Sequence, residues 1–375
     1  MLRLLPVVAV SLWFGGCSQP KTETKKSVAR QAETEANDIA RFLAGVPGRA
    51  DGPFRDLEPA AAWRRHKESF DRMWGVFEEK RLPAMRAFQE KELSGAGFSG
   101  DFVLYPFGGP DVLTVTTLFP KARNYVLIGL EPPGTLPSRE DVLAADLERQ
   151  LPRMEQTLDS LLRRSFFITA SMDKELRGQI TDGLLQVMLV QLARRGYTVL
   201  SHDRVTLNDA GELVARTGTV RRNRGVRIEA QGAKGEVARF VYLAANLNNK
   251  WLEENEPLRK FVARAGQPAA FFKSTSYMPH KREFSVLRDL ILAHCRAVVQ
   301  DDSGIPYKYV DRGKWDVRLY GEYKQPYGSF RYLVQKDLRK AYEAGAAPLG
   351  FRIGYGFGRV PSGLQVFVKK GPGRI

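Results

Sequence analysis

The chain has 375 residues, of which 43% are hydrophobic and 27% are charged. This composition is typical of a folded globular protein and excludes a collagen-like or largely disordered chain. Lys and Arg outnumber Asp and Glu by 58 to 42, which gives a formal net charge of +16. With 2 cysteines and 4 histidines, the sequence excludes a disulfide scaffold and a zinc site built from several thiolates. We therefore expect no metal site; on other grounds, given below, we also expect no cofactor.

The chain begins with the pattern of an export signal. An apolar run from Leu4 to Phe14 follows one basic residue, and two glycines precede Cys17. The run is too short to cross a bilayer as a helix, which takes about 20 apolar residues. The Gly-Gly-Cys sequence resembles the lipobox of bacterial lipoproteins, in which the cysteine becomes the new N-terminus and carries acyl chains.

The lipobox resemblance implies a signal peptide over residues 1–16 and lipidation at Cys17. It places the protein at the outer membrane or at the periplasmic face of the inner membrane, with its acyl chains in the lipid. The alternative is an ordinary cleaved signal with an incidental cysteine. Residues 18–37 contain no large apolar residue except Val28. They have too little apolar surface to fold alone, and residues 17–37 are expected to form a lipidated cysteine and a flexible tether.

Residues 38–100 are expected to form a helical segment. Between Ala60 and Glu92, aromatic residues recur among charges at the spacing of one helix face. Such a stripe is more often part of a core than of a ligand site. Pro83 is expected to kink or divide the helix.

Residues 101–375 have the pattern of a mixed α/β domain, either one unit or two packed halves divided near residues 200–250. In the first half, short apolar strands alternate with amphipathic helices, which favours parallel βαβ units and a Rossmann-like layered sheet. The predicted strands are Phe102–Tyr105, Tyr125–Leu130 and Tyr197–Leu200, and the predicted helices are Pro110–Phe119, Arg139–Arg164 and Ile180–Arg195.

Turn sequences at Asp209–Gly211 and Gly232–Gly235 predict antiparallel hairpins in the middle of the chain. Cys295 lies in a pattern expected to be helical, and we interpret it as a small buried hydrophobic residue rather than a nucleophile. The predicted helices of this part are Trp251–Ala265, Phe284–Val299 and Phe330–Ala344, and the predicted strands are Trp315–Tyr320, Phe351–Tyr355 and Leu364–Val368.

The most informative motif starts with Tyr105-Pro-Phe-Gly-Gly-Pro-Asp111 and continues to YVLIGLEPPG at residues 125–134. It predicts a strand, a glycine turn, a short helix, a second strand and then an acidic residue. Glu131 follows the glycines by about 20 residues, the position at which Rossmann-like folds place a ribose-binding carboxylate. The arrangement also resembles the first motifs of class I methyltransferases.

A purely structural interpretation of the same motif is also open. The glycines would make a tight turn, Asp111 would cap the helix, and Glu131 would face solvent. An exported lipoprotein has no ready supply of nicotinamide cofactor or S-adenosylmethionine. We therefore expect a Rossmann-like shape without a bound nucleotide.

A second group of candidate residues lies further along the chain. Asp301 and Asp302, in the sequence QDDSGIP, could ligate a cation or act as acid and base. Alternatively, they bond backbone amides in a turn that follows a helix. His280, in the sequence STSYMPHK, is the best candidate for a site histidine because polar and small residues flank it.

Basic residues are concentrated in two places. In an exported protein such clusters favour anionic lipid headgroups, lipopolysaccharide or acidic wall polymers as partners, and we expect no nucleic acid. The alternative is an ordinary solvated surface. The clusters are Arg221, Arg222, Arg224 and Arg227 at a predicted hairpin, and Arg352, Arg359, Lys369, Lys370 and Arg374 near the end of the chain.

Three stretches resemble an uncharacterised family of bacterial exported proteins and lipoproteins. They are YPFGGPD…LFP…YVLIGLEPPG, SFFITASM…LLQVMLVQLARRGY and SYMPHK…QDDSGIPYKYV…WDVRLYGEY. The resemblance runs from about residue 60 to the C-terminus and implies an exported, folded protein without an assigned activity. It places Asp111, Glu131, His280, Asp301 and Asp302 inside family-like motifs.

We therefore expect a lipid-anchored envelope protein that acts as a binding or structural module. One alternative is a hydrolase-like envelope enzyme on a Rossmann-like core, whose site would gather these five residues at the carboxyl ends of the strands. A weaker alternative is a degenerate methyltransferase-like fold.

Overall fold

A computed structural model describes residues 35–165, 180, 183–220, 222–356 and 362–371. The expected signal peptide, Cys17 and most of the expected tether lie outside these residues. No helix in the described ranges is long and apolar enough to span a membrane.

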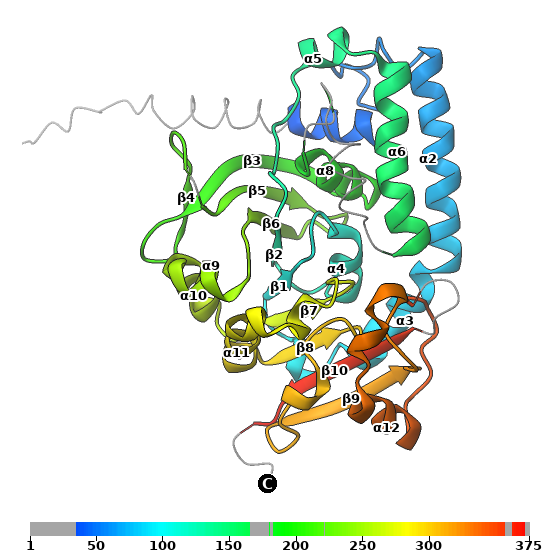
Figure 1. The fold of residues 1–375 in the computed structure, drawn as a ribbon. Coiled ribbons are helices and arrows are strands. Elements are labelled where there is room, and N and C mark those ends of the chain that lie inside the picture. Colours follow the sequence, from blue (N-terminus) through cyan, green and yellow to red (C-terminus); the bar gives the residue numbers. More distant parts are fainter. Residues whose placement is uncertain (1–34, 166–179, 181–182, 221, 357–361, 372–375) are drawn as a thin grey trace, which may run out of the picture.

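One ten-stranded mixed sheet forms the centre of the described structure, in the order β4-β3-β5-β6-β2-β1-β7-β8-β10-β9 (Figure 1). The sheet includes strands from both sides of residues 200–250. The strands are β1 Phe102–Pro106, β2 Asn124–Gly129, β3 Thr198–Leu207, β4 Leu213–Ala215, β5 Arg224–Gln231, β6 Val237–Ala244, β7 Ala269–Phe272, β8 Ala297–Gln300, β9 Trp315–Gly321 and β10 Gly363–Lys369.

The five central strands, β6-β2-β1-β7-β8, are all parallel to their neighbours. Numbered by their order along the chain, they run 3-2-1-4-5, which is the order of Rossmann-type sheets. The chain leaves β1 towards β2 on one side and later crosses to β7 on the other, so the order reverses between β1 and β7. Such a switch point leaves a crevice outside the carboxyl ends of the strands, where open α/β sheets bind ligands.

Antiparallel strands extend the sheet on both sides. β3 is antiparallel to both β4 and β5, and β5 joins β6 through the β5–β6 hairpin. At the other edge, β10 is antiparallel to both β8 and β9. The two hairpins predicted from turn sequences are thus present.

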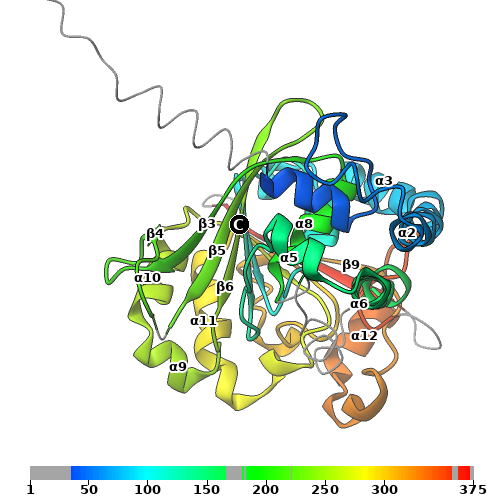
Figure 2. The ribbon, with the colours of Figure 1, turned by 90° about the horizontal axis from the view of Figure 1, so that it is seen from above.

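Helices cover both faces of the sheet (Figure 2). On one side lie α3, α4 and α8 with the long, adjacent helices α2 and α6, and on the other lie α9, α10 and α11. The described helices are α2 Ala61–Lys80, α3 Leu82–Glu92, α4 Val112–Leu118, α5 Arg139–Ala144, α6 Leu147–Arg164, α8 Leu185–Arg194, α9 Asn249–Glu254, α10 Glu256–Arg264, α11 Ser285–His294 and α12 Lys336–Ala344, and residues 35–43 are also helical.

Side chains that alternate along the central strands form two hydrophobic cores. Val103 and Leu127 join the core beneath α2, α6 and α8, whereas Leu104 and Val126 join the core beneath α9, α10 and α11. Successive strand residues point to opposite faces, and both faces are covered. This explains why β1 and β2 are nearly continuous apolar runs.

The predicted mixed α/β class, with parallel and antiparallel pairs, is confirmed. Pro83 stands in the first turn of α3 and divides the predicted helix, as expected. The predicted helix Trp251–Ala265 is also divided, because the Asn255 side chain caps the start of α10 and Pro257 stands in its first turn.

Several details differ from the sequence-based expectations. The predicted helix Arg139–Arg164 is divided into α5 and α6, because Ala145 is extended and Asp146 caps a new helix. Of the predicted helix Phe330–Ala344, only the part from Lys336 onward is α-helical, as α12. The strand at Tyr197–Leu200 is the start of β3, which pairs antiparallel with β5 rather than joining the parallel set. The predicted helix Phe284–Val299 ends at His294, and its last residues form β8, a buried parallel strand. Phe351–Tyr355 is not a strand; Phe351 and Ile353 instead pack their side chains into the core.

Candidate functional site

A cavity of about 330 Å³ lies at the carboxyl ends of β1, β2, β6 and β7, beside the switch point. Its volume falls within the range of small-molecule sites. Its walls come mainly from the loops that follow the four strands. These loops are Phe107–Asp111 after β1, Gly129–Glu131 after β2, Ala245–Leu247 after β6 and Lys273–Ser276 after β7.

The loop after β1 turns tightly over the ring of Tyr105. A Cβ added to Gly108 would lie 2.5 Å from that ring, and Gly109 has a φ of +53°. Both positions therefore favour glycine. Asp111 then caps α4, because Thr114 N donates to its Oδ1 at 3.1 Å. The predicted tight turn and helix cap are both present, and Asp111 also lines the cavity.

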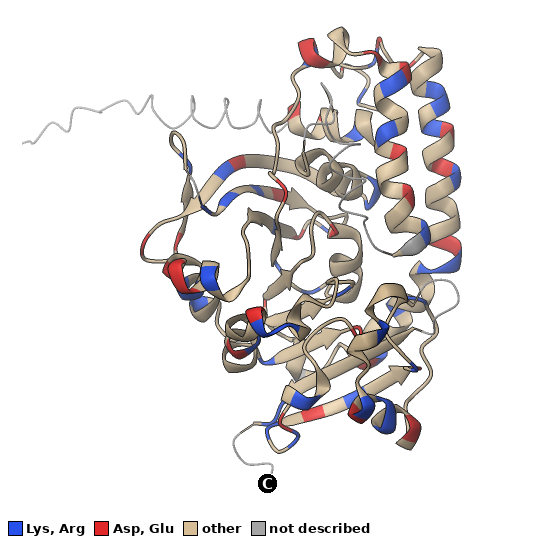
Figure 3. Cartoon of the chain, in the orientation of Figure 1, with Lys and Arg blue, Asp and Glu red and all other residues tan. Residues whose placement is uncertain are grey.

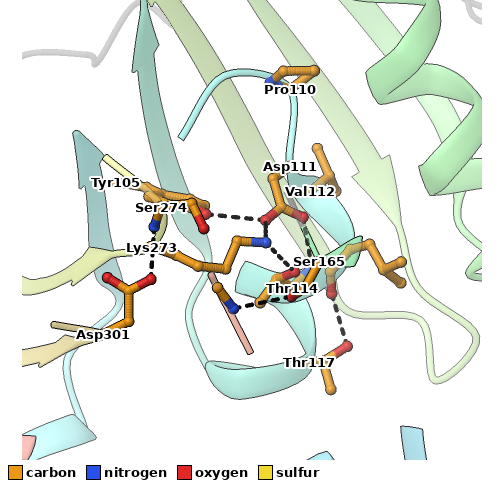
Figure 4. A network of polar contacts seen from close by, with 12 residues as sticks. Tyr105, Pro110, Asp111, Val112, Thr114, Thr117, Ser165, Lys273, Ser274 and Asp301 are labelled. Atoms are coloured by element: carbon orange, nitrogen blue, oxygen red, sulfur yellow. Dashed lines mark hydrogen bonds and ion pairs between the residues drawn. The ribbon is translucent and has the colours of Figure 1, made fainter. Parts of the chain in front are cut away.

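Asp111 is also the acceptor of a buried ion pair (Figure 4). Lys273 Nζ contacts Asp111 Oδ2 and donates to Thr114 Oγ1 at 3.1 Å. Tyr105 OH donates to the same carboxylate oxygen at 3.0 Å. The Lys273 and Asp111 side chains are only 2% and 1% exposed. The pair joins the loop after β1 to the end of β7 across the switch point.

Burial changes the proton affinities in this network. It lowers the pKa of Lys273, and the nearby Asp111 carboxylate opposes that effect. It raises the pKa of Tyr105, to which Asp111 adds in the same direction. Tyr105 is therefore a neutral donor at ordinary pH.

The network affects which ligands the cavity can hold. In Rossmann-type sites a pyrophosphate binds the free amides at the N-terminus of the first helix. Here the amide of Thr114 already donates its hydrogen bond to the Asp111 carboxylate, so it is not free for a phosphate. Lys273 is the one cation among the described lining residues, and Asp111 already neutralises it. Among the described lining residues, neither the Thr114 amide nor an unpaired cation is thus left to stabilise a phosphate.

Glu131 lies two residues after β2 and lines the same cavity as Asp111. Its Oε2 accepts from Leu130 N at 3.2 Å, and its carbonyl accepts from Tyr242 OH at 2.8 Å. No donor in the described part of the chain reaches Oε1. Glu131 is half-buried and keeps one carboxylate oxygen available at the cavity wall, which fits both the ribose-type interpretation and the alternative in which Glu131 faces solvent.

The loop after β7 forms the opposite wall of the cavity. Three successive backbone amides of this loop donate hydrogen bonds to side chains that do not line the cavity. Ser274 N donates to Asp301 Oδ2 at 2.8 Å, Thr275 N to Ser303 Oγ at 2.9 Å, and Ser276 N to Tyr355 OH at 3.1 Å. Ser274 and Ser276 both have positive φ angles, 51° and 53°.

Of the other predicted site residues, Asp301 supports this loop but does not line the cavity. Its Oδ1 accepts from the backbone amide and hydroxyl of Ser303, so the predicted turn-bonding role is present. Burial raises the pKa of Asp301, while its hydrogen-bond donors and Lys273 oppose that effect.

Asp302 and His280 form a separate contact. Tyr277 OH donates to Asp302 Oδ2 at 2.6 Å, and His280 Nε2 donates to the Asp302 carbonyl at 3.1 Å. Burial and the charge of Asp301 raise the pKa of Asp302 to about 8, and burial lowers that of His280 to about 4. The five candidates are therefore not gathered in one cavity: Asp111 and Glu131 line it, and the other three do not.

The remaining candidates have ordinary structural roles. Cys295 is fully buried just after α11, and burial raises the pKa of its thiol to about 12, as expected for a core residue. No three His, Cys, Asp or Glu side chains within the described ranges are grouped so that they could hold a metal ion.

The predicted basic clusters are partly neutralised by local partners. Arg222 pairs with Glu254 and Arg227 with Asp203, both at 2.7 Å. Arg221, Arg359 and Arg374 lie outside the described residues. Figure 3 shows basic and acidic residues interspersed over much of the molecule.

Lys273 and Ser274 line the cavity although neither is among the predicted site residues; Ser274 is the first residue of the STSYMPHK motif. The available signal was a lysine directly after the four-residue apolar run that forms β7. A larger hollow of about 1160 Å³ lies along α2 and α6, lined by helix-surface side chains, and includes none of the predicted site residues. Comparisons with protein-family models, curated proteins and solved structures found no match.

Proposed function

We propose that this chain is a lipid-anchored envelope protein whose folded body is a binding module for a small ligand with vicinal hydroxyls. The ligand is uncharged or cationic, and a ribonucleoside is the simplest example. One observation carries the proposal: Glu131 presents a carboxylate oxygen without a protein donor at the wall of the switch-point cavity.

The geometry of Glu131 suits two adjacent hydroxyl groups. A carboxylate only accepts hydrogen bonds, and at the end of the second strand of a Rossmann-type sheet it can accept from both hydroxyls of a ribose. The cavity supplies apolar surface for the rest of such a ligand. The apolar lining residues are Phe107, Ile128, Leu130, Leu247, Met278 and Phe284.

The preference for an uncharged or cationic ligand follows from the Asp111–Lys273 pair. An anionic group near the start of α4 would meet the Asp111 carboxylate and find Lys273 already neutralised. Dinucleotides are therefore disfavoured in the very crevice where Rossmann-type proteins usually bind them.

A second candidate is a methyltransferase-like body that holds the nucleoside part of S-adenosylmethionine. This ligand has two cationic groups, a sulfonium and an ammonium, but its carboxylate would lack a cationic partner among the described lining residues. The resemblance of the β1–β2 motif to class I methyltransferases supports it. So does the antiparallel strand β10 beside the fifth parallel strand, β8, an arrangement also found in that class. The hydrolase-like alternative has less support, because its five candidate residues lie in different places.

Isothermal titration calorimetry with adenosine, S-adenosyl-L-homocysteine, AMP and NAD⁺ tests the ligand class. We expect adenosine to bind at least about 10-fold more tightly than AMP or NAD⁺, and Glu131→Gln to weaken adenosine binding about 10-fold. Glu253→Gln, on the exposed surface of α9, is the matched control and should bind normally. Failure of adenosine to bind, tighter binding of AMP, or an unaffected Glu131→Gln variant would contradict the proposal.

The envelope part of the proposal has its own tests. Mass spectrometry of the mature N-terminus should find an acylated Cys17, and a Cys17 peptide without acyl mass would exclude the anchor. Association of the basic surface with anionic lipid or wall polymers should weaken as salt screens the charges. Salt-independent binding to anionic vesicles would argue against that association.

A further inference from the structure

We propose that the loop after β7 forms a second subsite in the same cavity, where the Ser274 hydroxyl hydrogen-bonds an uncharged polar group of the ligand. Asp301 acts there as a positioning residue. This inference rests on the proposed function and adds to it the chemistry of the ligand at the end away from its vicinal hydroxyls.

The first support is an unsatisfied polar atom. Ser274 Oγ is buried and has no hydrogen-bond partner among the described residues, although Ser274 lines the cavity. A buried hydroxyl without a partner is costly and uncommon in native structures. A ligand group in the cavity would satisfy it.

The second support is a concentration of unfavourable backbone conformations. Ser274, Ser276 and Tyr277 have φ angles of 51°, 53° and 53°, the left-handed region that non-glycine residues rarely adopt. Residues in such conformations persist only where their surroundings hold them, and they cluster at ligand-binding sites. Ser274 lines the cavity in this conformation.

Asp301 stabilises the backbone conformation of Ser274. Its own amide donates to Phe272 O at 3.1 Å, which continues the β7–β8 ladder by one residue. Its Oδ2 accepts from Ser274 N, and its Oδ1 accepts from Ser303. Asp301 is thus held in place by the sheet and by Ser303. Its hydrogen bond to Ser274 N therefore fixes the backbone of Ser274.

The electrostatics of this wall favour an uncharged group. Asp301 is buried behind the amide of Ser274, and Lys273 is paired with Asp111. A carboxylate or phosphate of the ligand would find no unpaired cation among the described lining residues. A serine hydroxyl both donates and accepts, so it fits a ligand hydroxyl or carbonyl.

The test uses a pair of probes, adenosine and 5′-deoxyadenosine, which differ by one uncharged hydroxyl. The native protein should bind adenosine about fivefold to tenfold more tightly, the value of one hydrogen bond. Ser274→Ala should bind both probes equally, at the native affinity for 5′-deoxyadenosine. The matched control, Ser201→Ala on β3, should discriminate as the native protein does.

Asp301→Ala, which removes the acceptor of Ser274 N, distinguishes positioning from a general structural effect. Displacing Ser274 alone removes the discrimination between the probes and leaves 5′-deoxyadenosine binding unchanged. A general loss of structure would weaken both probes equally and keep their ratio, which would overturn the positioning role.

The outcomes also separate this inference from the proposed function. If adenosine binds in a Glu131-dependent way but Ser274→Ala still prefers it, the subsite is wrong and the proposed function stands. If the native protein binds neither probe, both are wrong.

Discussion

The Asp111–Lys273 pair gives the sharpest prediction about stability. Lys273→Met removes the cation but keeps an unbranched side chain of similar length at the end of β7. The Asp111 carboxylate would then lie buried with Tyr105 and the α4 amide as donors but without a neutralising charge. Removing one partner of a buried pair typically destabilises a protein by about 3–5 kcal/mol.

The double variant Lys273→Met/Asp111→Asn separates the charge from the packing. Asn is a good helix cap and can still accept from Thr114 N. Replacing both charges of a buried pair is often close to neutral. We therefore expect the double variant to recover most of the lost stability, with a cost below about 2 kcal/mol.

Urea unfolding followed by circular dichroism at pH 7 measures these two variants and the single variant Asp111→Asn, which completes the mutant cycle. We expect a strongly favourable coupling between the two positions in this cycle. It would be refuted by a cost below about 1 kcal/mol for Lys273→Met, or by a double variant as unstable as the sum of the single ones.

Three further predictions concern the surroundings of the cavity. Gly108→Ala should lower the free energy of unfolding by about 1–3 kcal/mol, because its Cβ would lie 2.5 Å from the Tyr105 ring; urea midpoints check this, and a neutral effect would contradict the geometry. Burial lowers the pKa of His280 to about 4, below its unfolded value of 6.5, so the unfolded chain takes up the proton first and stability falls as pH drops from about 6.5 to 4. His280→Gln should therefore lose less stability than the native protein between pH 7 and pH 5, and an equal loss would be against this assignment. A thiol reagent should label Cys295 only after unfolding, since the side chain is fully buried; peptide mapping that finds it labelled in the native protein would disagree.

The sequence predicted the half of the site that depends on local spacing. Glycine turn, capped helix, second strand and Glu131 follow one another within about 30 residues, the length of one βαβ unit. Local turn and capping interactions determine how these features are placed relative to one another. Asp111 and Glu131 accordingly line the same cavity.

The other half depends on which strands become neighbours. Lys273 and Ser274 reach the cavity because β7 pairs with β1, a segment far away in the sequence. No local pattern specifies that pairing. For the same reason β8 was predicted as part of a helix. Its apolar residues come shortly after α11 and continue the hydrophobic run of that helix. Short apolar runs do not distinguish a buried strand from a helix.

The sequence grouping of Asp301, Asp302 and His280 failed for a geometric reason. Consecutive residues at the end of β8 point in different directions, so Asp301 turns to the β7 loop while Asp302 turns to Tyr277. His280 follows Tyr277 and contacts the Asp302 carbonyl. Asp301 and Asp302 are thus neighbours in the sequence, but neither lines the cavity.

The proposed diol-binding cavity at the switch point is tested most directly by a crystal structure of the protein soaked with adenosine. We predict that the nucleoside lies in the cavity beside Gly108, with its ribose hydroxyls within about 2.6–3.2 Å of Glu131 Oε1. Adenosine found elsewhere, for example in the hollow along α2 and α6, or no bound nucleoside at millimolar concentration, would contradict it.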